Sequence, residues 1–175
     1  MAWIFSLSAE CGSDQSNVNQ FAQHFEGREW ILSNGRQCQC NTDTFQDMEQ
    51  NWWCRVYPNN ISEVGINSPE SAYLMTELGI LLYQTLRFTS SFRYALVGVE
   101  VDEFRTYSEL MEDLPNLSLP GLVLAKVLSH GLEILPLFRT FSSSYIWQPY
   151  AGEIYNPLMA SPDLKNKLNE LLAVS

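Results

Sequence analysis

The stretch Tyr94-Ala95-Leu96-Val97-Gly98-Val99-Glu100-Val101 decides the fold. Its odd-numbered positions are all alanine or valine, and its even-numbered positions are also largely apolar. Side chains alternate between the two faces of a strand, so this pattern indicates a strand that is covered on both faces. The sequence therefore predicts a central sheet strand over 94–101.

Two helices share the same start signal. Ser68-Pro69-Glu70 combines an N-cap, a proline at the first helical position and an acid at the positive end of the helix dipole. Apolar residues then continue to Leu86 around nearly the whole circumference, which predicts a central and mostly buried helix. Ser161-Pro162-Asp163 repeats the signal, and leucines follow on one face. This predicts a terminal amphipathic helix.

The chain before residue 68 supplies the other predicted strands. Runs rich in aromatic and β-branched residues predict strands over 3–8 and 52–57, and Val18, Phe21 and Phe25 lie on one face of a helix between them. Asn34-Gly35 is the preferred pair for a type I′ turn, because both residues need a positive φ. It predicts a two-residue hairpin between 29–33 and 36–40.

These elements predict a single α+β domain over residues 1–175. Read in order, residues 1–104 give the split β-α-β-β-α-β arrangement of a ferredoxin-like core. Residues 105–175 are expected to pack on this core as an extension. The extension holds a helix that starts at the capping box Thr106-x-x-Glu109, a run over 122–128 that fits either helix or strand, an irregular aromatic segment from Phe138 to Tyr155, and the terminal helix.

The composition excludes several classes of protein. The 175 residues include 20 acidic and 10 basic ones, a net charge of −10, so the basic patch of a nucleic-acid binder is missing. A chain that is 46% hydrophobic and 13% aromatic is not a disordered acidic tail. We expect no membrane span and no export signal, and hence a cytoplasmic location. Neither glycine-rich phosphate motif occurs, so we expect no nucleotide cofactor.

The candidate catalytic residues are His24, His130, Glu100 and Asp102. Glu100 and Asp102 share a face at the end of the central strand, where carboxylates can act as acids or bases or hold Mg²⁺. A solvated acidic rim is the simpler interpretation of these acids. The alternative is a small enzyme or small-ligand binder that uses a carboxylate and a histidine in a pocket between the sheet and the C-terminal loop.

The cysteines are weak candidates for a metal site. Cys38 and Cys40 alternate on one predicted strand and so face the same side. Cys54, with Cys11 or His24, could complete a zinc tetrahedron, although C-x-C is not the usual zinc knuckle. Cysteine is also among the most buried residue types, so we favour reduced, buried thiols and no metal.

The candidate binding residues are aromatic or acidic: Trp53, Tyr145, Trp147, Tyr150, Glu109 and Glu112. The aromatic segment can either pack against the sheet or form a recognition surface, since tyrosine and tryptophan are enriched in interfaces. An acidic field would steer a basic partner towards such a surface. We therefore expect a non-enzymatic binding or regulatory protein that engages a basic protein, in the manner of an inhibitor or immunity protein that neutralises a toxin or nuclease.

Overall fold

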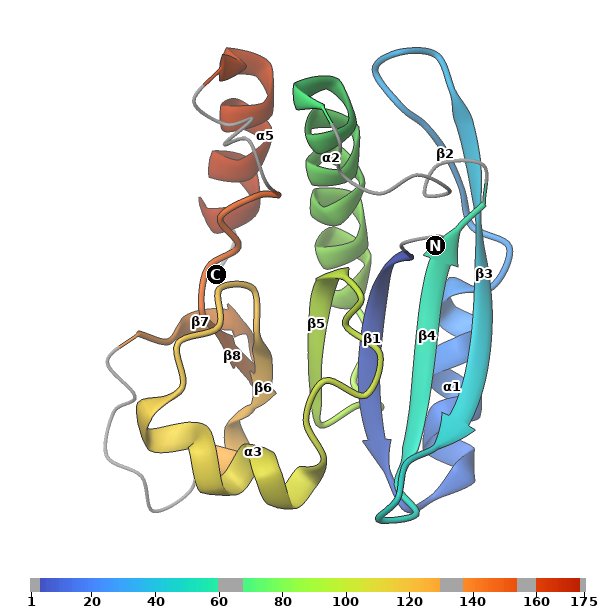
Figure 1. Ribbon diagram of the computed structural model, residues 1–175, viewed down its shortest axis with the longest axis vertical. Helices are drawn as coiled ribbons and strands as arrows, with labels where there is room; N and C mark the ends of the chain where they lie inside the picture. The colour runs from blue at the N-terminus through green and yellow to red at the C-terminus, as the bar shows by residue number, and fades with distance from the viewer. Residues whose placement is uncertain (1–3, 60–67, 130–136, 154–159, 174–175) are drawn as a thin grey trace.

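The computed structural model describes residues 4–59, 68–129, 137–153 and 160–173. They form an eight-stranded sheet with helices packed on it (Figure 1), which confirms the mixed α+β class. The strands are β1 (Phe5–Gly12), β2 (Glu29–Ile31), β3 (Gln37–Gln46), β4 (Trp52–Pro58), β5 (Tyr94–Val99), β6 (Val123–Ala125), β7 (Arg139–Ser142) and β8 (Tyr145–Trp147). The helices are α1 (Gln15–Phe25), α2 (Pro69–Leu86), α3 (Tyr107–Asp113) and α5 (Pro162–Ala173), and 3-10 turns lie at Leu114–Asn116 and Lys126–Ser129.

The strand order across the sheet is β2-β3-β4-β1-β5-β6-β8-β7, and every pairing is antiparallel. The specific ferredoxin-like topology is not confirmed, because this overall order differs from that of a four-stranded core. Three of the additional strands, β6, β7 and β8, come from the segment 105–175, which continues the sheet. The assignment of residues 1–175 to one domain, with parts 1–104 and 105–175, stays a prediction.

Strand β5 has the central position that its sequence predicts, but it ends at Val99, two residues before the predicted end. Glu100 and Asp102 therefore follow the strand and do not share one of its faces. The strand pairs with β1 on one side and with β6 on the other, and its residues from Tyr94 to Gly98 are buried. One face of the sheet is covered by α1, which packs on β1, β3 and β4, and by α2, which packs on β1 and β5; α5 packs on α2 (Figure 1). The segment after β5 covers part of the opposite face.

The helix starts predicted at Ser68, Thr106 and Ser161 are confirmed. Asp14 accepts the backbone N–H of Ser16 at the start of α1. Ser68 and Ser71 form a capping box at the start of α2, and Thr106 and Glu109 form another at the start of α3. Each box satisfies backbone donors that a helix start otherwise leaves without partners.

The hairpin between β2 and β3 is confirmed, but its turn type is not. Leu32 O accepts the N–H of Gly35 at 2.9 Å, and Gly35 has φ +83°, whereas Asn34 does not have a positive φ. This is a three-residue loop with a glycine in the left-handed region, the next most common class of hairpin. Leu32 is 2% exposed. Burial of that side chain outweighs the local preference of Asn-Gly for a tighter turn.

The aromatic segment is more regular than its sequence suggests. β7 and β8 form an antiparallel hairpin that turns at Ser143 and Ser144. The run over 122–128 divides into β6 and a 3-10 turn. Strands of three or four residues are too short to show a clear alternation, so their pattern gave little local signal.

Candidate functional site

The segment 100–106, called the strap below, crosses the face of the sheet that α1 and α2 leave open. Asp102 binds Arg55 of β4 at 2.8 Å, and the same guanidinium binds Asp43 of β3 at 2.7 Å. The ring of Phe104 packs edge-on against Trp53 and Tyr94, with centroids 5.5 and 5.9 Å apart. The strap is therefore held both by an ion pair and by aromatic packing.

Two residues of the strap have a left-handed backbone. Glu100 has φ +56° and Glu103 has φ +35°, a region that residues other than glycine rarely adopt. The carboxylate of Glu100 accepts the backbone N–H of Ile4 at 3.2 Å. The contacts that Asp102 and Phe104 make with the sheet compensate for the backbone strain at these positions. The side chains of Glu100 and Glu103 stay exposed.

Acidic side chains gather on the strap and on α3. We define the acidic surface by its exposed carboxylates: Glu100, Glu103, Glu109, Glu112 and Asp113. The segment 100–113 has six acidic residues and one arginine, a net charge of −5, which is half of the −10 of the whole chain. Arg105 binds Asp113 at 3.1 Å. In the described residues, neither Glu103 nor Glu112 has an ion-pair partner within 4.0 Å.

An exposed apolar residue lies beside the acidic surface. Met48, in the β3–β4 turn, is 86% exposed. The next residue, Glu49, accepts the backbone N–H of Ser108 at 3.1 Å, which attaches the turn to the first turn of α3. Asp47 is buried and accepts the indole N–H of Trp53 at 2.8 Å, so a second hydrogen bond holds the turn to a side chain of β4. Sequence reasoning missed Met48, because a single methionine in a polar turn gives no pattern.

The predicted aromatic binding residues lie in the core. Trp53, Tyr145, Trp147 and Tyr150 are all at most 4% exposed. Tyr145 stacks on Phe92 and donates its hydroxyl to Phe92 O at 2.7 Å, and Trp147 packs on Tyr83. These rings therefore pack against the sheet and offer no face to a partner. The two acidic candidates, Glu109 and Glu112, are exposed.

The candidate catalytic residues do not come together. His24 Nε2 lies 3.1 Å from Thr85 O and links α1 to α2. Asp102 forms an ion pair with Arg55, and the carboxylate of Glu100 accepts the backbone N–H of Ile4. His130 lies outside the described residues. Within those residues, no hydrogen bond joins a histidine to a carboxylate or to a thiol.

The four cysteines are buried free thiols. Burial raises the pKa of Cys40 and of Cys54 to about 12, and it also raises the pKa of Cys11 and Cys38. Thiolates are the form that binds metal, so these environments disfavour ligation. In the part of the chain that the structure describes, no group of three or more histidine, cysteine or acidic side chains is arranged to hold a metal ion.

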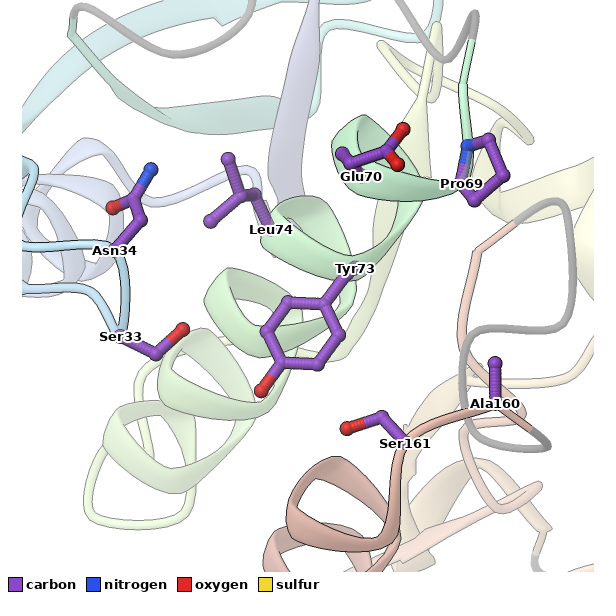
Figure 2. Close-up of a pocket in the computed structure, with 8 residues that line it drawn as sticks. All are labelled: Ser33, Asn34, Pro69, Glu70, Tyr73, Leu74, Ala160 and Ser161. Carbon is purple, nitrogen blue, oxygen red and sulfur yellow. The ribbon is translucent and has the colours of Figure 1, made fainter.

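A cavity of about 540 Å³ opens where the β2–β3 turn meets the starts of α2 and α5 (Figure 2). Pro69, Glu70, Tyr73 and Leu74 line it from α2. The β2–β3 turn contributes Ser33 and Asn34, and the start of α5 contributes Ala160 and Ser161. Among the described residues that line this cavity there is no histidine. The cavity lies at the helix layer, whereas the sequence suggested a pocket between the sheet and the C-terminal loop.

None of the helices in the described residues has the length and apolar character needed to cross a membrane. Comparison of the chain with protein-family models, with curated proteins and with solved structures found no match.

Proposed function

We propose that the protein is a non-enzymatic binding protein whose acidic surface engages a basic protein partner. The observation that carries the proposal is the position of Met48, whose apolar side chain is almost fully exposed. The carboxylate of the next residue, Glu49, accepts the backbone N–H of Ser108 and so holds this turn at the start of α3. Exposed methionine is adaptable and polarisable, and it is enriched at protein interfaces.

The charge arrangement supports the same function. Half of the net charge lies in residues 100–113, and Glu103 and Glu112 have no cationic partner in the described residues. Such a field raises the association rate of a basic partner, and the apolar side chain supplies contact area once the partner has docked. An inhibitor or immunity protein that neutralises a basic toxin or nuclease would use a surface of this kind.

The rigidity of the surface supports binding through a preformed site. The strap is anchored by Asp102 on Arg55 and by Phe104 on two rings, and the β3–β4 turn by Asp47 on Trp53. A partner therefore would not have to order these segments, which lowers the entropic cost of association.

We also propose that the sheet contains a ferredoxin-like arrangement and that the protein works in a reducing compartment. The adjacency β3-β4-β1-β5 supports a ferredoxin-like arrangement inside the larger sheet, because the chain passes from β1 through α1 and the short strand β2 to β3, and β4 lies between β1 and β3. The four free thiols support a reducing compartment such as the cytoplasm.

The binding proposal is tested with a fluorescein-labelled peptide of alternating lysine and leucine and with its glutamate counterpart. We expect the lysine peptide to bind, as fluorescence anisotropy shows, and to lose affinity steeply as sodium chloride rises. The glutamate peptide should not bind. The double variant Glu103→Lys/Glu112→Lys should weaken binding about tenfold, and Met48→Ala should weaken it without changing the salt dependence.

The control is Glu29→Lys/Glu170→Lys, which changes the net charge by the same amount at exposed positions on β2 and α5. We expect this variant to weaken binding by less than about twofold, because its charges lie outside the acidic surface. Equal losses from the two double variants would mean that the peptide responds to net charge alone, and the acidic surface would not be the binding site.

A further inference from the structure

The cavity at the starts of α2 and α5 has the size and the walls of a small-molecule site. Its volume of about 540 Å³ lies within the range of roughly 300–1,000 Å³ that is common for ligand pockets. Tyr73 and Leu74 are only partly buried and line it from α2, and Pro69 and Ala160 add apolar surface. This wall suits an apolar or aromatic body.

The described residues give the cavity four polar side chains, those of Ser33, Asn34, Glu70 and Ser161. In Figure 2 the hydroxyls of Ser33 and Ser161 point towards Tyr73 from opposite sides. Among the described residues that line the cavity, Glu70 is the one that carries a charge. Glu77 lies further along α2 and is 3% exposed; it accepts the N–H of Ser33 at 2.7 Å. Lys167 Nζ lies 3.2 Å from its other oxygen, so the charge of Glu77 is already compensated.

Both helix starts are already capped, which argues against an anionic ligand. At the start of α2, Ser68 accepts the N–H of Ser71 at 3.1 Å. At the start of α5, Ser161 accepts the N–H of Leu164 at 3.3 Å. A helix start attracts anions mainly through unpaired N–H groups. Of the charges that the described residues bring to the cavity, the carboxylate of Glu70 is the one that favours a cation.

We propose that this cavity binds a small ligand with an apolar or aromatic body and a protonated amine. The body lies against Tyr73 and Leu74, and the amine pairs with Glu70. The ring of Tyr73 offers a further attraction, because a cation is stabilised over the face of an aromatic ring. This site is distinct from the acidic surface and goes beyond the binding function proposed above.

The test uses three probes of similar size: phenethylamine, neutral 2-phenylethanol and anionic phenylacetate. Binding is measured by saturation-transfer NMR and by calorimetric titration. We expect phenethylamine to bind with a dissociation constant on the order of a millimolar, 2-phenylethanol to bind several-fold more weakly, and phenylacetate not to bind. Absence of phenethylamine binding, or tighter binding of phenylacetate, would overturn the proposal.

Variants locate the site. Glu70→Gln should weaken the binding of phenethylamine several-fold and leave that of 2-phenylethanol unchanged, whereas the control Glu170→Gln, at an exposed position of α5, should change neither.

Leu74→Trp should fill the cavity and abolish binding of both probes. Ala160→Trp, at an exposed position, gives the same readout if Leu74→Trp does not fold. Binding that survives both tryptophan variants, or that Glu70→Gln leaves unchanged, would contradict the proposal. Glu70→Gln should not affect the lysine peptide, so the two proposals fail separately.

Discussion

The hydroxyl oxygen of Tyr150 lies 2.6 Å from the position that a Cβ atom on Gly79 would occupy. Gly79 is in the interior of α2, where glycine costs roughly 0.5–1 kcal/mol relative to alanine. Tyr150 is 4% exposed and packs on Tyr83 with ring centroids 5.0 Å apart, so it has little room to retreat. The close approach explains why the helix carries a glycine here.

We expect Gly79→Ala to destabilise the protein by about 1–3 kcal/mol, although alanine is the better helix former. Urea unfolding followed by circular dichroism measures this change. In a Tyr150→Phe background the nearest oxygen is gone, so the same substitution should cost less. A stabilising Gly79→Ala would show that the side chain of Tyr150 moves aside freely.

The carboxylate of Glu10 is fully buried and depends on Arg93. Arg93 Nε donates to Glu10 Oε1 at 2.8 Å, a second nitrogen of the guanidinium contacts Oε2, and the backbone N–H of Gly12 donates to Oε1 at 2.7 Å. Arg93→Ala leaves this buried charge without its cation and should cost about 3 kcal/mol. The control Arg105→Ala breaks the exposed pair with Asp113 and should cost at most about 1 kcal/mol. Equal costs in urea unfolding would contradict this account.

Glu103 has a left-handed backbone and Glu112 lies in a helix. Replacing either by glycine removes the same charge, so the effects of the two variants on stability can be compared directly. Glu103→Gly relieves a positive φ and should stabilise the protein by about 0.5–1 kcal/mol. Glu112→Gly removes the same charge but places a glycine inside α3, and should destabilise the protein by about 1 kcal/mol. Thermal unfolding measures both changes. A loss of stability in Glu103→Gly would show that the strap does not strain this residue.

The buried thiols should react slowly in the folded protein. At pH 8, a thiol with a pKa of about 12 has roughly a thousandfold less thiolate than one with the ordinary value of 9.0, and Cys40 and Cys54 are in this state. We expect little reaction with Ellman's reagent until urea unfolds the chain, when all four thiols should react. Rapid modification of the folded protein would mean that these strands open often.

Sequence reasoning succeeded where a signal is local. The caps at Ser68 and Thr106 and the apolar alternation of β5 all rest on neighbouring residues, and each is confirmed. The β7–β8 hairpin could not be found in this way, because its short strands are specified by tertiary packing of Tyr145 and Trp147. The acidic candidates Glu109 and Glu112 are exposed, and their role in binding stays a prediction. For the aromatic segment the sequence left packing and recognition open, because a segment without a regular period does not tell which of its rings face the core.

The pH dependence of stability should show a contribution from Glu153. Its carboxylate accepts the hydroxyl of Tyr150 at 2.5 Å, and its backbone N–H donates to Thr76 on α2. Burial raises the pKa of Glu153 above its ordinary 4.5, and the hydrogen bond from Tyr150 offsets part of that shift. The folded protein therefore keeps the proton to a higher pH than the unfolded chain does.

The sign of the effect follows from which state binds more protons. Between 4.5 and the raised pKa, the folded state holds the extra proton, so stability falls as pH rises through this window. Glu153→Gln cannot ionise but can still accept from Tyr150. The free energy of unfolding of this variant minus that of the original protein should therefore increase from pH 4 to pH 7. Urea unfolding at each pH measures this difference. Glu170→Gln, which removes an exposed carboxylate on α5, should show a nearly constant difference over the same range. A constant difference for Glu153→Gln as well would mean that the carboxylate ionises as easily in the folded protein as in the unfolded chain.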